Sequence, residues 1–381
     1  MSAYHPERAR AERAVLVQLD LGQPDQDALL AEFQFLAVSA GADVVACVRG
    51  QRRQPNPATY AGGGKVQEIA EIVAAQDVNL VIFNHALSPG QERNLERRLQ
   101  CRVIDRTSLI LDIFALRAKS AEGKLQVELA QLAHLSTRLV RGWSHLERQQ
   151  GGIGVRGPGE TQLETDRRLL GKRVKLLQSR LARLSRQRAV QRKARHRGDV
   201  LNVSLVGYTN AGKSTLFNAL THANVYAADQ LFATLDTTSR QLWIEGAGQV
   251  VISDTVGFIR DLPHELIASF KATLESTAAA DLLLHVVDSS SPLRKEQIAE
   301  VNQVLDEIGA NAPQIEVWNK IDLTRADARI ERDEYARILR VRLSAIAVRE
   351  AANLPLLRRA LLEFARQRKQ AVCPAPVDNP V

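Results

Sequence analysis

A glycine-rich segment at residues 207–214 has the composition of a phosphate-binding loop. Its residues GYTNAGKS match the pattern G-x-x-x-x-G-K-[ST] and stand between an apolar run and a run with helical periodicity. Glycines let backbone N–H groups surround phosphate oxygens, Lys213 adds charge at the β and γ groups, and the Ser214 hydroxyl is a magnesium ligand. We expect the nucleotide to contact Gly207, Tyr208, Thr209, Asn210, Ala211, Gly212, Lys213, Ser214 and Thr215.

A second motif lies about forty residues further on, at the end of the apolar run 250–253. Asp254-Thr255-Val256-Gly257 matches D-x-x-G, in which the carboxylate lies near magnesium and the glycine amide lies near the γ-phosphate. The residue after Gly257 is Phe258, where many phosphate-hydrolysing switch proteins have a glutamine that orients the attacking water. Because an apolar side chain cannot orient water, we predict slow hydrolysis that a partner accelerates.

A third motif selects the base. Asn319-Lys320-Ile321-Asp322 follows the apolar run 315–318. The Asp322 carboxylate can accept hydrogen bonds from guanine N1–H and N2–H₂, whereas adenine would leave it unpaired at a cost of about 1 to 3 kcal/mol. The motif therefore favours GTP over ATP, and Ser344 and Ala345, at the end of the next predicted strand, are expected on the base side.

The segment between the first two motifs contains three threonines that could reach magnesium and the γ-phosphate. They are Thr234, Thr237 and Thr238, and the residues alone do not choose among them.

These motifs need alternating strands and helices to position them. After residue 198 the hydrophobic pattern predicts strands at 200–206, 240–244, 249–254, 282–287, 314–318 and 341–345, with helices at 213–221, 264–278, 294–309 and 349–368. We interpret 198–368 as a P-loop GTPase domain with a doubly wound sheet, and 369–381 as a disordered tail.

The first part of the chain has its own α/β pattern. Runs at 14–21, 43–48, 78–83 and 101–105 read as strands separated by helices, which predicts a parallel-sheet domain over 1–118. The loop Gly62-Gly63-Gly64-Lys65 opens one of these helices; we favour a helix cap or an RNA-contacting turn over a second phosphate site.

Residues 119–197 are predicted to form a basic helical hairpin. Strand signals vanish from 106 to 197, two long helical stretches flank a glycine-rich tip at 149–160, and leucines of the second stretch follow a heptad seam. The formal charge of the 381-residue chain is +8, but residues 138–200 hold seventeen Lys and Arg against five Asp and Glu, so the rest sums to −4. Such a segment is typical of an element that faces a polyanion.

Cysteine usage and hydropathy bound the compartment. Three scattered cysteines, Cys47, Cys101 and Cys373, form no CxxC pair and predict reduced thiols. No apolar run approaches the roughly 18 residues of a membrane span, so we expect a cytoplasmic protein.

Longer strings resemble the HflX family of translational GTPases over nearly the whole chain. They are YAGGGKVQEI at 60–69, DRTSLILDIFALRA at 105–118, GGIGVRGPGETQLETDRR at 151–168, LFATLDTTSR at 231–240 and DTVGFIRDLPHELIASFKATLES at 254–276. The resemblance implies an N-terminal α/β domain, a helical hairpin and a GTPase domain in this order. It also implies a protein that uses Mg²⁺, binds the large ribosomal subunit and its rRNA, splits or rescues stalled ribosomes, and hydrolyses GTP under ribosome stimulation. We expect the chain to be a monomer.

The resemblance also narrows the site. It favours Thr234 as the switch threonine, with Phe232, Ala233, Leu235 and Asp236 beside the nucleotide, although the family commonly has proline where Thr237 stands. Lys213, Thr234 and Gly257 are then expected to act on the reacting phosphate, and Ser214 and Thr234 to hold the metal.

The basic hairpin suits insertion among RNA phosphates. The expected contacts are Arg156 at the tip and Arg167, Arg168, Lys172 and Arg173 on the second helix. One alternative is a solvated coiled-coil face. Another keeps GTP as a gate but has the chain act as an RNA-remodelling or RNA-modification partner on non-ribosomal RNA.

Overall fold

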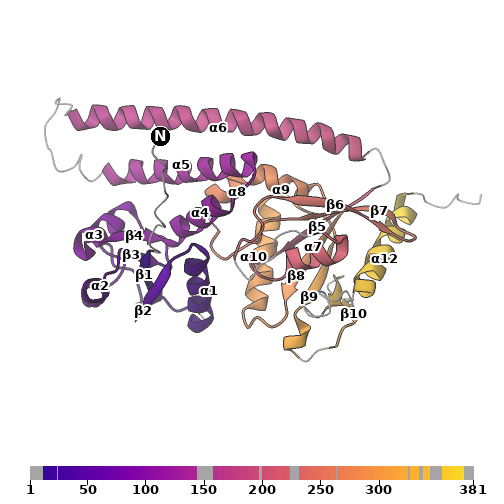
Figure 1. Cartoon of the computed structure of the whole chain (residues 1–381), viewed down its shortest axis with the longest axis horizontal. Helices are drawn as coiled ribbons and strands as arrows, with labels where there is room; N and C mark the ends of the chain where they lie inside the picture. Colours follow the sequence, from indigo (N-terminus) through magenta and orange to yellow (C-terminus); the bar gives the residue numbers. More distant parts are fainter. Residues whose placement is uncertain are drawn as a thin grey trace, which may run out of the picture. The chain divides into compact units, whose positions relative to one another are not determined.

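The structure is a computed structural model that divides the chain into two compact units. It describes residues 12–23, 25–143, 158–196, 200–223, 231–262, 264–324, 327–333, 338–343 and 354–372. Unit 1 contains the described residues of 1–118 and 124–179, and unit 2 contains those of 119–123 and 180–381. The division into three domains, at 1–118, 119–197 and 198–368, remains a prediction, because the two compact units have different boundaries. Figure 1 shows the elements and their labels.

Unit 1 contains a four-stranded parallel sheet. Its strands are β1 (Arg13–Asp20), β2 (Asp43–Gln51), β3 (Leu80–Phe83) and β4 (Arg102–Asp105), in the order β2-β1-β3-β4. They alternate with α1 (Gln26–Ser39), α2 (Gly63–Ala75) and α3 (Pro89–Leu99), so the predicted parallel α/β domain is confirmed.

Alternation along the central strands explains how both faces of this sheet are covered. Val15, Val17 and Phe83 belong to one apolar cluster with α2 and α3. Leu16 and Ile82 are fully buried on the opposite face, where α1 and α4 (Arg106–Arg117) contact the sheet.

Local chemistry sets where these helices begin. At the start of α3, the Ser88 side chain accepts a hydrogen bond from Gln91 N, and the Gln91 side chain accepts one from Ser88 N. Pro89 occupies the first turn. Gly62 is the N-cap of α2, as the helix-cap interpretation predicted, and Lys65 pairs with Glu68 at 2.7 Å.

The helical region differs from the prediction in one place. Within the described part of this region, three helices rather than two follow the first sheet: α4, α5 (Ala121–Trp143) and α6 (Pro158–His196). The chain leaves α4 at Ala118, which has ψ of 109°. Leu177 and Leu181 of the predicted seam are buried, and so is Leu129 of α5. Most of the glycine-rich tip, including Arg156, lies outside the described residues, and α6 begins at Pro158, a position proline favours.

Unit 2 contains a seven-stranded sheet in the order β10-β11-β9-β8-β5-β7-β6. The five central strands are parallel, and β6 and β10 pair antiparallel at the edges. The strands are β5 (Leu201–Gly207), β6 (Thr238–Ile244), β7 (Gly248–Asp254), β8 (Leu282–Asp288), β9 (Gln314–Asn319), β10 (Ile330–Asp333) and β11 (Ile338–Arg342).

Helices cover both faces of this sheet, which agrees with the expected doubly wound fold class. Leucines of α7 (Lys213–Thr221) and α12 (Leu354–Val372) share an apolar cluster with β5 and β8. Helices α9 (Lys271–Ala278) and α10 (Arg294–Glu307) also contact β5. In α9, the Thr277 hydroxyl is hydrogen-bonded to the Ser204 hydroxyl of β5. The helix predicted at 264–278 is broken near Phe270 into α8 (His264–Ser269) and α9. Across the described residues, no helix has the length and apolar character needed to span a bilayer.

Candidate nucleotide-binding site

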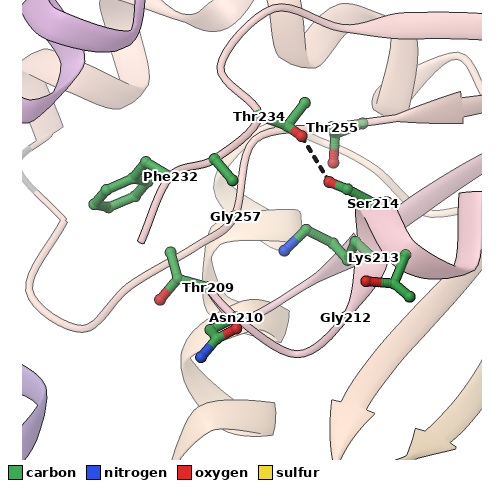
Figure 2. Close-up of a pocket in the computed structure, with 11 residues that line it drawn as sticks. Thr209, Asn210, Gly212, Lys213, Ser214, Phe232, Thr234, Thr255 and Gly257 are labelled. Atoms are coloured by element: carbon green, nitrogen blue, oxygen red, sulfur yellow. Dashed lines mark hydrogen bonds between the residues drawn. The ribbon is translucent and has the colours of Figure 1, made fainter. Parts of the chain in front are cut away.

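The loop between β5 and α7 forms one wall of a pocket, as Figure 2 shows. Gly212 is the N-cap of α7 and has φ of 97°, a left-handed conformation that favours glycine. A Cβ at Gly212 would also collide with the Asn319 amide. The tight turn therefore depends on the second glycine of the motif.

Lys213 is buried beneath this loop. Its Nζ donates to the carbonyl oxygens of Gly207 at 3.1 Å and Tyr208 at 2.7 Å. Burial lowers the pKa of Lys213 to about 8, and the nearby Asp254 carboxylate opposes that shift. The ammonium is thus held at the place where the motif predicts a phosphate.

Three oxygen-bearing side chains converge next to Lys213. Ser214 Oγ lies 2.6 Å from Thr234 Oγ1 and 2.7 Å from Asp254 Oδ2, and Thr234 Oγ1 donates to Asp254 Oδ2 at 3.0 Å. Burial raises the pKa of Asp254, while the hydrogen bonds from Ser214 and Thr234 lower it. Oxygens of this kind are the ligands that a hard divalent cation prefers.

The structure distinguishes the three candidate threonines. Thr234 is the one whose hydroxyl joins Ser214 and Asp254. Thr237 Oγ1 is buried with no hydrogen-bond partner among the described residues, and Thr238 begins β6. The positions agree with the threonine that the family resemblance favoured.

Backbone hydrogen bonds join the residue after the D-x-x-G motif to the phosphate-binding loop. Phe258 N donates to Gly207 O at 3.1 Å, and Thr209 N donates to Phe258 O at 2.7 Å. A Cβ at Gly257 would lie 2.9 Å from Thr209 Cα and 3.0 Å from Lys213 Nζ, so only glycine fits here. The Phe258 side chain is 2% exposed. It therefore packs in the interior, and no polar group replaces the missing glutamine at this position.

The base-selecting motif also reaches the loop. Asn319 Nδ2 donates to Ala211 O at 2.9 Å, and Asn319 Oδ1 is buried with no partner among the described residues. Lys320 Nζ pairs with Asp288 at 2.7 Å, and Asp322 lies in the 3-10 turn Ile321–Leu323. Ser344 and Ala345 lie outside the described residues.

Sequence reasoning missed the residues that hold this motif. Ser289 Oγ donates to Asn319 O at 2.6 Å, next to Asp288 at the end of β8. The signal was available, because the buried run 282–287 ends in a polar cluster, the usual position of binding residues in parallel sheets.

Not every predicted residue lines the pocket. Those that do are Thr209, Asn210, Gly212, Lys213, Ser214, Thr215, Phe232, Ala233, Thr234, Thr255 and Gly257. Leu235 is buried in the interior, and the Asp236 carboxylate bonds backbone N–H groups of Lys119 and Ser120 instead.

The predicted RNA-contacting residues of α6 are at the surface of unit 1. Arg167, Arg168 and Lys172 are exposed, and Arg173 pairs with Glu128 of α5 at 2.5 Å. The basic side chains therefore lie away from the buried seam.

Comparison with protein families matches three consecutive segments. A family described as "GTP-binding GTPase N-terminal" matches residues 27–115, and "GTP-binding GTPase Middle Region" matches 117–195. A third, described as "50S ribosome-binding GTPase", matches 202–320.

Individual relatives are similar over most of their length. A "GTPase HflX" of Escherichia coli (strain K12) is 57% identical over 354 residues, which is 92% of this chain and 82% of the relative. A "GTPase HflX" of Magnetococcus marinus is 48% identical over 327 residues, 84% of this chain and 76% of the relative. Among solved structures, the SsGBP–GDP complex has a TM-score of 0.50 at 24% identity, covering 93% of this chain and 99% of that one, a likeness of fold.

Proposed function

Because this chain belongs to the HflX family of GTPases, we propose that it binds the large ribosomal subunit in its GTP form and leaves after hydrolysis. Splitting or rescue of stalled ribosomes in the cytoplasm would be the outcome of that cycle. The observation that carries the proposal is the match of residues 202–320 to a family described as "50S ribosome-binding GTPase". This range holds the first two nucleotide motifs and the first two residues of the third. As a GTPase, the chain is a hydrolase that converts GTP to GDP and phosphate.

Magnesium fits the oxygen cluster beside Lys213. Ser214 and Thr234 would supply hydroxyl ligands, and the Asp254 carboxylate lies against both, with Oδ1 buried and without a partner among the described residues. When bound there, the ion would neutralise charge that develops on the phosphate oxygens. The single positive charge of Lys213 would not balance the negative charge of a triphosphate without such an ion.

A partner must complete the catalytic site in this scheme. Phe258 is buried and its backbone is bonded to the phosphate-binding loop, so its side chain cannot orient water. Stimulation by the ribosome would supply the missing group or reshape the switch segments.

The exposed basic face of α6 supports RNA contact. Arg167, Arg168 and Lys172 are exposed, which leaves their charge available to phosphates. Arg156, Arg173 and the glycine-rich tip complete the proposed contact, with the chain acting as a monomer.

GTP turnover with and without purified large subunits tests the proposal. We expect turnover to rise by at least tenfold when large subunits are added, with small subunits as the matched control. Equal GTP turnover with and without large subunits would contradict the proposal. Sedimentation of a lysate with a GTP analogue provides a second test, since a factor for non-ribosomal RNA would not move into ribosomal fractions.

A further inference from the structure

The carboxylate of Asp236 lies at the beginning of helix α5. It accepts from the backbone N–H groups of Lys119 at 3.2 Å and Ser120 at 2.8 Å, and from the Ser120 hydroxyl. The same hydroxyl oxygen accepts from Gly123 N at 2.8 Å. Ser120 thus caps the first turn of α5 through the Gly123 N–H, and Asp236 holds Lys119 and Ser120, which directly precede the helix.

The fit between these groups is close. A Cβ at Gly123 would lie 2.5 Å from Asp236 Oδ1, so a side chain at this position would push the carboxylate away. A carboxylate at a helix N-terminus is also favoured by the helix dipole. Residues 119–123 belong to the same compact unit as Asp236, so this contact lies within unit 2.

Asp236 is two residues from Thr234, which lines the nucleotide-binding pocket. Thr234 Oγ1 contacts Ser214 and Asp254, whereas Asp236 faces the first turn of α5. A movement of Thr234 away from Ser214 would pull on a segment whose next polar anchor is Asp236. The chain between them is too short to absorb a large displacement, because each residue spans at most about 3.6 Å.

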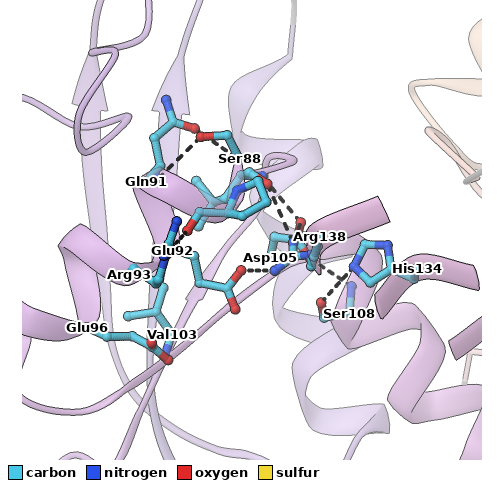
Figure 3. Close-up of polar contacts among 12 residues, drawn as sticks. Ser88, Gln91, Glu92, Arg93, Glu96, Val103, Asp105, Ser108, His134 and Arg138 are labelled. Carbon is cyan, nitrogen blue, oxygen red and sulfur yellow. Dashed lines mark hydrogen bonds and ion pairs between the residues drawn. The ribbon is translucent and has the colours of Figure 1, made fainter. Parts of the chain in front are cut away.

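The far part of α5 is anchored in unit 1, as Figure 3 shows. Arg138 pairs with Glu92 and, at 2.5 Å, with Asp105, whose side chain is 2% exposed. Asp105 Oδ1 in turn accepts from Ser108 N at the start of α4. Helix α5 therefore starts next to residues that Asp236 contacts, and Arg138, near the other end of the same helix, makes a buried ion pair.

We propose that Asp236 is a positioning residue that couples the nucleotide to helix α5. With GTP bound, Thr234 is held at the site and Asp236 caps the first turn of α5. With GDP, the segment 231–236 is released, the cap is lost, and residues 119–123 fray. This inference rests on the proposed function, because it explains how the nucleotide state reaches the hairpin that carries the RNA-contacting residues.

Amide hydrogen exchange of the full chain tests the coupling directly. The N–H groups of Lys119, Ser120 and Gly123 are the ones that this cap bonds. In the wild-type chain we expect them to exchange about tenfold more slowly with a non-hydrolysable GTP analogue than with GDP, as the loss of a hydrogen bond to a charged group predicts. Both nucleotides are used at saturating concentration.

Two variants remove the cap from opposite sides. In Asp236→Ala, Lys119 and Ser120 should exchange equally fast with either nucleotide. In Ser120→Ala, the nucleotide-dependent difference at Gly123 should disappear while GTP affinity stays at the wild-type value, because Ser120 does not line the nucleotide pocket. The matched control is Ser88→Ala, which removes a similar cap from α3 and should leave the difference at 119–123 unchanged.

Equal exchange of these amides with both nucleotides in the wild-type chain would overturn the inference, as would a difference that survives in Asp236→Ala. These measurements contain no ribosomal subunits, so their outcome does not depend on ribosome binding. Co-sedimentation with large subunits is then compared for wild type and Ser120→Ala. We expect the variant to lose its preference for the GTP form, and a preserved preference would count against the coupling. Failure of the wild-type chain to co-sediment would contradict the proposed function, and the exchange data would still decide the coupling.

Discussion

Lys213 is the residue whose removal should affect the nucleotide most. Its buried ammonium donates to the Gly207 and Tyr208 carbonyl oxygens of the phosphate-binding loop. We expect Lys213→Ala to weaken GTP binding by roughly one to two orders of magnitude, since a hydrogen bond to a charged group contributes about 1.5 to 3 kcal/mol. Titration with a fluorescent GTP analogue measures this. Lys295→Ala removes the same charge from an exposed position and serves as the control; wild-type affinity in Lys213→Ala would refute the phosphate assignment.

Phe258 should not be convertible into a catalytic glutamine by substitution alone. Its side chain is 2% exposed and its backbone is bonded on both sides to the phosphate-binding loop. A glutamine amide in this interior would lack partners, at a cost of about 1 to 3 kcal/mol in unfolding free energy. We expect Phe258→Gln to lower the unfolding free energy while intrinsic turnover stays within about threefold of wild type. A strong acceleration in single-turnover assays would show that the side chain can reach the water.

His285 should make the stability of unit 2 sensitive to acid. Burial lowers its pKa to about 4, with the charge of Glu316 and a hydrogen bond to the Gln314 side chain partly opposing the shift, and Nδ1 has no partner among the described residues. The unfolded chain binds a proton on this ring below about pH 6.5, but the folded chain does so only near pH 4. The stabilisation by the neutral ring is therefore fully present above pH 6.5 and is lost as the pH falls toward 4, by up to about 3 kcal/mol.

The variant His285→Gln replaces the imidazole with an amide that does not titrate. Between pH 6.5 and 4.5, the unfolding free energy of His285→Gln should fall less steeply than that of the wild-type chain. Urea unfolding at the two pH values measures the slopes, and parallel slopes would contradict the assignment.

At the scale of elements, the strands that carry the site were predictable because they are buried on both faces. Runs such as 80–83, 201–207 and 282–288 are almost continuously apolar, as central parallel strands are. The motifs at their carboxyl ends then follow from the geometry of the fold. Strand β10, with the sequence IERD, was missed because an edge strand with charged residues has no such pattern.

The break between α4 and α5 could not be predicted for a different reason. Ala118, Lys119 and Ser120 are all compatible with a helix. What holds the residues before the next helix is a contact of Lys119 and Ser120 with Asp236, more than a hundred positions away in the sequence. Local propensity contains no information on such a partner.

The ion pair that holds α5 in unit 1 should be important for stability. The side chain of Arg138 is 15% exposed and that of Asp105 is 2% exposed, and burial lowers the pKa of Arg138. Arg138→Met would leave the Asp105 carboxylate buried without its cation, and we expect a loss of about 3 to 5 kcal/mol in unfolding free energy.

The control for this prediction is Arg49→Met. Arg49 pairs with Asp27, whose side chain is 88% exposed, so its loss should cost less than about 1 kcal/mol. Thermal and urea unfolding compare the two variants. Similar losses would show that burial does not set the strength of the Arg138 contact.

At the scale of the whole molecule, the uneven distribution of charge predicts how binding responds to salt. Reversing Arg167, Arg168 and Lys172 to Glu should weaken binding to large subunits and reduce the slope of log affinity against log salt by about 2 to 3, if each contacts one phosphate. GTP affinity should stay unchanged. The matched control reverses Lys295, Arg359 and Arg366, which are exposed in unit 2 and change the net charge equally. Equal effects of the two triple variants would mean that net charge, not the α6 face, attracts the RNA.

The membership of residues 119–123 in unit 2 has a practical and an evolutionary consequence. A fragment that starts at residue 198 would contain every nucleotide motif but would lack Lys119 and Ser120, to which Asp236 is bonded. Such a fragment should bind GTP and leave a carboxylate exposed that the intact protein covers. Domains that are interleaved in this way cannot be exchanged as separate modules, so we expect the hairpin and the GTPase to have been inherited together.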